Sequence, residues 1–228
     1  MDAISTQVWE NPELSLQRLI NETRTACLDV YRRDPARIRE DARKERATAE
    51  GGYGRKQILE LVQNASDAML DDPGRIEVRL TDKHLYVANQ GKPFEQDGVT
   101  ALLYTHLSGK SEDEIGRFGL GFKSIAAISS SPEIYSRTVS FGFDKARALD
   151  EISQVVSNVS EVPALRLAWI LPIRNARLED PDLNELMGWA TTVVKVPIEH
   201  ELKAVSDDIR QFPAWFVLFA RHVQQIDL

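Results

Sequence analysis

The chain has 228 residues, with 28 basic and 35 acidic side chains and a formal net charge of −7. Its hydrophobic fraction of 43% is typical of a globular domain with a buried core and excludes a chain that is disordered or rod-like throughout. No apolar run approaches the roughly 18–20 residues that span a bilayer, no secretory signal opens the chain, and the single cysteine excludes a disulfide framework or a multi-cysteine metal site. We therefore expect a soluble cytoplasmic protein without membrane contact, and the acidic balance argues against nucleic-acid binding by this domain.

The first fifty residues are expected to form a charged helical extension. Apolar side chains recur at helical spacing through residues 13–46, and Pro35 should interrupt the helix because proline lacks an amide donor. Residues 32–46 carry seven basic and four acidic side chains, which is typical of a solvated helix face. A docking surface for a partner or for nucleic acid is the alternative. We divide the chain into this extension, residues 1–50, and a domain, residues 51–228.

Helices and short strands then alternate without a regular β-α-β rhythm. The pattern predicts helices over residues 55–70, 99–107, 118–128 and 212–221. It predicts strands over residues 75–80, 84–88, 133–136, 138–143, 165–171, 192–198 and 222–228, with a hairpin turn at 81–83. Residues 144–163 are weakly patterned. This interleaving favours the α+β class over a doubly wound parallel sheet.

The predicted helix 55–70 has two opposed faces. At about 100° per residue, one arc is an apolar stripe suited to a core; it consists of Ile58, Leu61, Val62, Ala65 and Met69. Glu60, Asn64 and Asp67 lie on the opposite side at spacing i, i+4, i+7, so that two carboxylates and an amide point the same way. Taken alone, this is also the solvent-exposed face of an ordinary amphipathic helix.

A loop with Asn89 and Gly91 follows the predicted strand 84–88. Glycine lets a backbone approach a flat ligand closely, and the Asn89 amide offers both a donor and an acceptor, as the edge of adenine does. Asparagine and glycine are also the usual residues of a plain turn, so the loop by itself leaves both interpretations open.

A second loop, residues 115–124, carries glycines at 116, 119 and 121 ahead of an apolar helical pattern. Backbone amides at such a helix start form a cradle for anions, and Lys123 is a cation at its end. A P-loop is excluded because its first glycine would fall on Tyr104, and a dinucleotide fingerprint is excluded because its last glycine would fall on Ser124.

Together these segments resemble the GHKL ATPases, the superfamily of gyrase B, the ninety-kilodalton heat-shock chaperones, histidine kinases and MutL. Residues 60–68, ELVQNASDA, are similar to the N-box of the chaperones. Residues 89–94, NQGKPF, resemble the next box, usually D-x-G-x-G. Residues 115–124, IGRFGLGFKS, resemble the glycine box, with an ending also seen in MORC-like and sacsin-like proteins, and residues 192–197, TVVKVP, resemble the late threonine strand. The four boxes occur in the family's order.

The resemblance implies a Bergerat fold, a two-layer sandwich with a mixed sheet, helices on one face and a lid over the nucleotide. It implies a chaperone-like module that binds ATP with Mg²⁺ and slowly hydrolyses it to ADP and phosphate. The nucleotide cycle would drive conformational change or nucleotide-dependent homodimerisation, and these changes would act on downstream domains of a longer protein.

The resemblance also implies roles for residues of the first two boxes. Glu60 would be the general base that orients water on the γ-phosphate, and Asn64 would hold Mg²⁺ through its amide oxygen. Asp67 and Ala68 would lie near the ribose and base. In the second box Asn89 would meet adenine, with Gly91 allowing its close approach and Phe94 as a further nucleotide contact.

The later boxes would hold the triphosphate and complete the adenine site. Residues 108–114 would be a short lid with Lys110 as a phosphate contact. The residues implied around the triphosphate are Gly116, Gly119, Gly121, Phe122 and Lys123. Thr192 would reach the adenine through a hydrogen bond or a water molecule.

Two residues depart from the family pattern. Asn89 stands where most members have aspartate, and Pro93 replaces the second glycine of that box. The amide oxygen of Asn89 can still accept the adenine amino proton, but charge assistance is lost. Because a reversed amide would tolerate guanine, the sequence leaves the choice of base open.

Three other functions compete with this interpretation. A nucleotide sensor without useful hydrolysis is an alternative, because in several GHKL branches a following domain supplies a cation to the γ-phosphate. A histidine kinase is disfavoured because no histidine precedes residue 60. A purely structural or protein-interaction role would require all four boxes to be vestigial.

Overall fold

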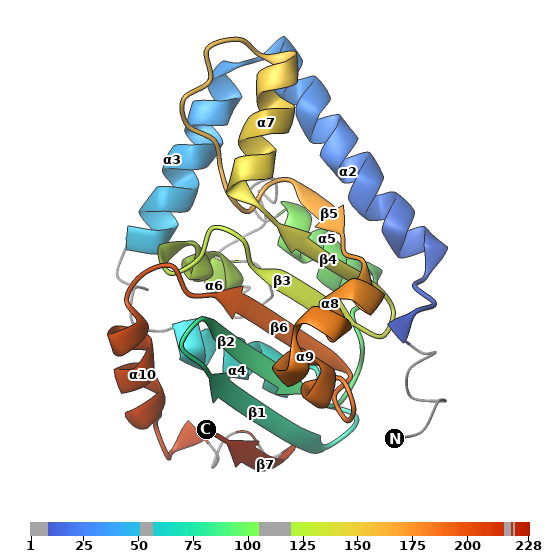
Figure 1. Ribbon diagram of the computed structural model, residues 1–228, viewed down its shortest axis with the longest axis vertical. Helices are drawn as coiled ribbons and strands as arrows, with labels where there is room; N and C mark the ends of the chain where they lie inside the picture. The colour runs from blue at the N-terminus through green and yellow to red at the C-terminus, as the bar shows by residue number, and fades with distance from the viewer. Residues whose placement is uncertain (1–8, 51–56, 105–119, 217–219, 221) are drawn as a thin grey trace.

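A computed structural model describes residues 9–50, 57–104, 120–216, 220 and 222–228 (Figure 1). Seven strands form one mixed sheet in the order β5-β4-β3-β6-β2-β1-β7. Neighbouring strands pair antiparallel, except β1 and β7, which are parallel. The strands are β1 (Gly74–Leu80), β2 (His84–Asn89), β3 (Glu133–Ser136), β4 (Ser140–Phe143), β5 (Ala168–Ile170), β6 (Thr192–Pro197) and β7 (Val223–Asp227). The α+β class and the mixed sheet are thus confirmed.

The helices lie on both faces and at one end of this sheet (Figure 1). They are α2 (Leu14–Arg33), α3 (Ala36–Glu50), α4 (Gln57–Asp67), α5 (Gln96–Tyr104), α6 (Leu120–Lys123), α7 (Lys145–Val155), α8 (Ile173–Glu179), α9 (Pro181–Leu186) and α10 (Leu202–Arg210). A 3₁₀ turn, Ser124–Ala127, follows α6 directly. In the described parts of the chain, every helix is too short or too polar to traverse a lipid bilayer.

Alternate side chains of the central strands enter two separate cores. Leu85 and Val87 of β2 pack with the apolar stripe of α4. Tyr86 and Ala88 of the same strand face the other way, into a core completed by residues of α8 and α9. The expectation of helices on one face is therefore corrected, because two short helices cover part of the opposite face. The near-continuous apolar run of β2 explains this, since a strand buried on both sides lacks the usual alternation.

The first two helices pack against the rest of the described chain. α2 contributes Leu16 and Ile20 to the main core, and its Tyr31 joins Ile38 of α3 in a third core beside α7 and β5. The predicted break at Pro35 is confirmed, because α2 ends at Arg33 and α3 begins at Ala36. α3 also contacts α6 and the 3₁₀ turn.

Several elements differ from the prediction. The helix expected over residues 212–221 is wrong for residues 212–215, which are not helical, because Pro213 disfavours a helical conformation at Phe212. The unpredicted α10 precedes this segment and ends at Arg210. α7 lies in the weakly patterned stretch, and α8 and α9 were also missed. The helix expected over 118–128 divides into α6 and the 3₁₀ turn within its described part.

The loop after β2 closes tightly against the end of α4. Gly91 has a φ of +96°, and a Cβ atom there would lie 2.4 Å from the carbonyl oxygen of Ala68. The next amide, that of Lys92, donates to the same oxygen at 2.8 Å. Only glycine satisfies both the positive φ and the close approach, so Gly91 fixes how the loop leaves the sheet.

We predict that Gly91→Ala lowers the free energy of unfolding by about 1–3 kcal/mol, because the side chain must move the loop away from Ala68. Urea unfolding measures this. The control is Lys92→Ala, which removes only an exposed ion pair with Asp71 and should change little. Equal stability of the wild-type and Gly91→Ala proteins would contradict the close approach.

Candidate functional site

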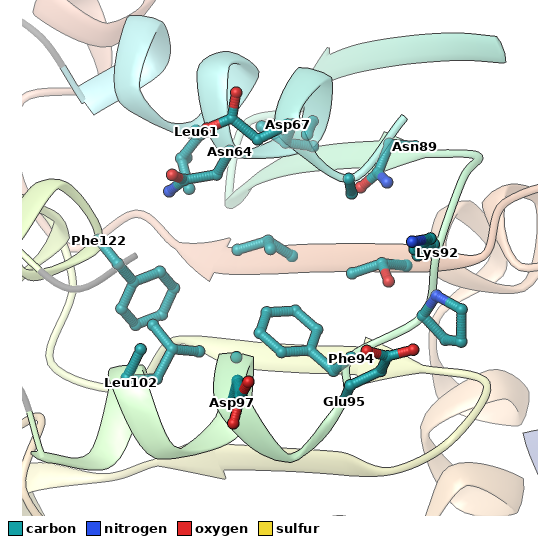
Figure 2. A pocket seen from close by; sticks show the side chains of 18 residues that line it. Leu61, Asn64, Asp67, Asn89, Lys92, Phe94, Glu95, Asp97, Leu102 and Phe122 are labelled. Atoms are coloured by element: carbon teal, nitrogen blue, oxygen red, sulfur yellow. The ribbon is translucent and has the colours of Figure 1, made fainter. Parts of the chain in front are cut away.

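A cavity of about 460 Å³ lies between α4 and α5, over strands β2 and β6. Figure 2 shows its lining side chains converging from these elements. α4 contributes Leu61, Asn64, Ala65 and Asp67, and Ala68 follows directly after it; the strands contribute Val87, Asn89, Thr192 and Val194. The opposite wall runs from Lys92 to Leu102, and Phe122 of α6 completes the lining. Ligand pockets commonly combine such apolar walls with a few polar groups.

Seven residues singled out in the sequence meet in this cavity. They are Asn64, Asp67, Ala68, Asn89, Phe94, Phe122 and Thr192. Glu60, Gly91 and Lys123 are not among the described lining residues, and for Gly121 the structure describes only its place in α6. Lys110, Gly116 and Gly119 lie outside the described residues. The structure thus brings together at least one residue from each of the four sequence boxes.

The strand register sets the floor of the cavity. Asn89 of β2 lies opposite Thr192 of β6, and Thr192 lies opposite Ser136 of β3. The Thr192 hydroxyl donates to Ser136 Oγ at 3.3 Å. Ser136 Oγ also accepts from the amide of Phe94 at 2.9 Å, which fixes the loop to the sheet. Sequence reasoning missed Ser136, whose only signal was a polar residue at the end of an apolar strand.

The side-chain amide of Asn89 has a defined orientation. Its Nδ2 donates to the carbonyl oxygen of Gln90 at 2.6 Å, and a carbonyl can only accept. The other atom of the amide, Oδ1, has no hydrogen-bond donor within the described residues. Figure 2 shows this side chain extending from β2 toward the cavity. The floor therefore offers an acceptor to a ligand that brings an N–H group.

Three carboxylates line the two walls. Asp67 comes from α4, and burial raises the pKa of its carboxyl. Glu95 and Asp97 lie across the cavity at the start of α5 (Figure 2). Sequence reasoning missed these two, although acidic residues before a helix are a recognisable N-terminal signal. Within the described residues no cluster of three or more histidine, cysteine, aspartate or glutamate side chains forms a metal site.

Glu60 lies one helical turn before Asn64 on α4 and is half-buried. The two residues share one line along the helix, but only Asn64 lines the cavity. α4 contacts α6, the helix that follows the glycine loop in the sequence. Glu60 is thus next to the cavity rather than in its wall.

Lys123 lies where the prediction did not expect it. Its side chain is 1% exposed, and the neighbouring residue, Phe122, is the one that faces the cavity. Consecutive helical residues point about 100° apart, so Lys123 turns away from the cavity toward α3. Burial and the adjacent Arg166 lower the pKa of its ammonium to about 8, against the attraction of Glu45 and Asp41.

Comparison with known proteins gives one partial relationship. Protein NO VEIN from Arabidopsis thaliana is 39% identical over 93 residues, which are 38% of this chain and 3% of that protein. The chain therefore spans only a small fraction of this relative. No family model matches the chain.

We predict that the stability difference between the wild-type protein and Lys123→Met depends on pH. Between pH 8 and the ordinary lysine pKa of 10.5, the folded state loses this proton while the unfolded state keeps it. Wild-type stability should therefore rise relative to the variant, by roughly 2 kcal/mol by pH 10.

Urea unfolding at pH 7, 8.5 and 10 measures this difference. The control is Lys44→Met, at an exposed position of α3. Its stability difference from the wild type should be the same at all three pH values. If the stability difference between the wild type and Lys123→Met is also independent of pH, the burial of the Lys123 ammonium is contradicted.

Proposed function

We propose that this chain is a GHKL-type module that binds ATP with Mg²⁺ and hydrolyses it slowly, driving conformational change or dimerisation of a longer protein. One observation carries the proposal. Residues from all four family-like boxes, far apart in the sequence, line a single cavity. The mixed sheet with α4 and α5 against one face supports the Bergerat arrangement.

The floor and walls suit a purine base. Apolar side chains of α4, α5 and α6 offer flat contact surfaces, and the volume of about 460 Å³ is within the range of small-molecule sites. The free acceptor on Asn89 suits the amino group of adenine. Guanine would present a carbonyl oxygen to that acceptor, and two acceptors facing each other are unfavourable. Adenine is therefore the base that this floor would accept.

The polar side of α4 suits a magnesium ion carried by phosphates. Asn64 supplies a hard oxygen donor, its amide oxygen, which Mg²⁺ prefers, and this ion is commonly held by one or two protein groups together with substrate phosphates. The absence of a larger acidic cluster among the described residues fits that mode. When bound, the ion would neutralise phosphate charge, and Asn64 would orient it.

Glu60 is the proposed general base. It lies one turn from Asn64, at the side of the cavity where the phosphates would extend, and would take the proton of the attacking water. A nucleotide-sensing module without significant hydrolysis is the second candidate. It is favoured by the position of Glu60 outside the cavity lining and by the burial of Lys123, which leaves that cation away from the phosphates.

We predict that Glu60→Ala lowers ATP turnover by about 10²–10⁴-fold and leaves Mg-ATP affinity within a few-fold of the wild type. Multiple-turnover phosphate release and calorimetric titration measure the two quantities. The matched control is Gln63→Ala, an exposed residue of the same helix.

Unchanged turnover in Glu60→Ala would refute its role as the base. Binding without turnover in the wild-type protein would favour the sensor over the ATPase.

A further inference from the structure

Four charged side chains are buried together beside the cavity. They are Asp41 and Glu45 of α3, Lys123 of α6, and Arg166 in the segment before β5, and none is more than 9% exposed. Two acids and two bases balance in formal charge. Because burying an ion carries a large desolvation cost, a purely packing role is a poor explanation for this group, which we name the α3 charge cluster.

Asp41 is connected to the end of α5. Its Oδ2 accepts from the Tyr31 hydroxyl at 2.8 Å and lies 3.4 Å from Arg166 Nε. Arg166 Nη1 in turn donates to the carbonyl oxygen of Leu103 at 2.6 Å. Leu103 is in the last turn of α5, so α3 contacts the C-terminal end of that helix through one arginine.

Glu45 is connected to α6 by charge. Its two carboxylate oxygens accept from the amides of Ala164 and Leu165 at 2.7 and 2.8 Å, which fixes the carboxylate in place. Lys123 Nζ has no hydrogen-bond partner in the described part of the chain. Its ammonium is attracted by Glu45 and Asp41. α3 contacts α6, and these two acids offset part of the cost of burying the ammonium beside it.

The residues next to these contacts form the wall of the cavity. Leu102 precedes Leu103, and Phe122 precedes Lys123; both side chains line the cavity. We propose that Asp41 and Glu45 are positioning residues of the cavity. They hold α5 and α6 at the spacing at which Leu102 and Phe122 form its wall, so that α3 sets the ligand affinity. The identity of the ligand rests on the proposed function, whereas the positioning does not.

The test compares Glu45→Gln with Glu40→Gln, an exposed acid of the same helix. Hydrogen exchange is measured at the amides of residues 102–104 and 120–123 and, for reference, at those of β2 and β6. We expect Glu45→Gln to lose protection in the first two segments and keep it in the strands, and Glu40→Gln to match the wild type. Mg-ATP affinity should fall about tenfold in Glu45→Gln only.

The double variant Glu45→Gln, Lys123→Met supplies the rescue. It removes the ammonium that Glu45→Gln leaves uncompensated, so it should restore most of the lost protection and affinity. If Glu45→Gln does not fold, Asp41→Asn replaces it in the same comparison.

The positioning role would be overturned if Glu45→Gln loses protection evenly over helices and strands, or if it loses no protection at all. If the wild-type protein does not bind Mg-ATP, the proposed function fails. The exchange measurement still decides the role of the α3 charge cluster in that case.

Discussion

The antiparallel pairing of β2 with β6 is the constraint on which the cavity depends. It sets Asn89 opposite Thr192 and directs both side chains to the side of the sheet that carries α4 and α5. A shift of one residue in this register would turn them into the opposite core. Tyr86, Ala88 and Val193 fill that opposite core, so burial on both faces opposes such a shift.

The second constraint is the two-sided helix α4. Its apolar stripe packs on the sheet, and that packing directs Asn64 and Asp67 into the cavity. Gly91 then brings the following loop against the last turn of α4. Ser136 ties the same loop to β3 through Phe94. The cavity is thus bounded by elements that the main core already holds in place, and its polar groups sit on rigid supports.

Local patterns were sufficient to predict much of this arrangement. The periodicity of residues 55–70 predicted which side of α4 is polar, and the turn at 81–83 and the break at Pro35 followed from the residues that favour them. These features depend on neighbours within a few positions in the sequence, which is why the sequence alone reveals them. The seven predicted residues of the cavity came instead from the resemblance of four separated boxes to a family pattern.

The features that the sequence did not predict depend on tertiary contacts. Lys123 follows the glycine loop in the sequence, yet its side chain is buried near Asp41 and Glu45 of α3, which lie far away in the sequence. α8 and α9 are short and gain their stability from the core on the second face. Glu95 and Asp97 belong to the cavity only because α5 lies opposite α4, and no spacing in the sequence signals that contact.

The central claim is that this cavity binds an adenine nucleotide through a magnesium ion. Calorimetric titration of the whole chain with ATP tests it most directly, in the presence of Mg²⁺ and again with the metal chelated, with GTP as the competing base. The account predicts one site for Mg-ATP, an affinity at least about tenfold lower for GTP or without the metal, and a comparable loss in Asn64→Ala. No binding of Mg-ATP to the wild-type protein would contradict it.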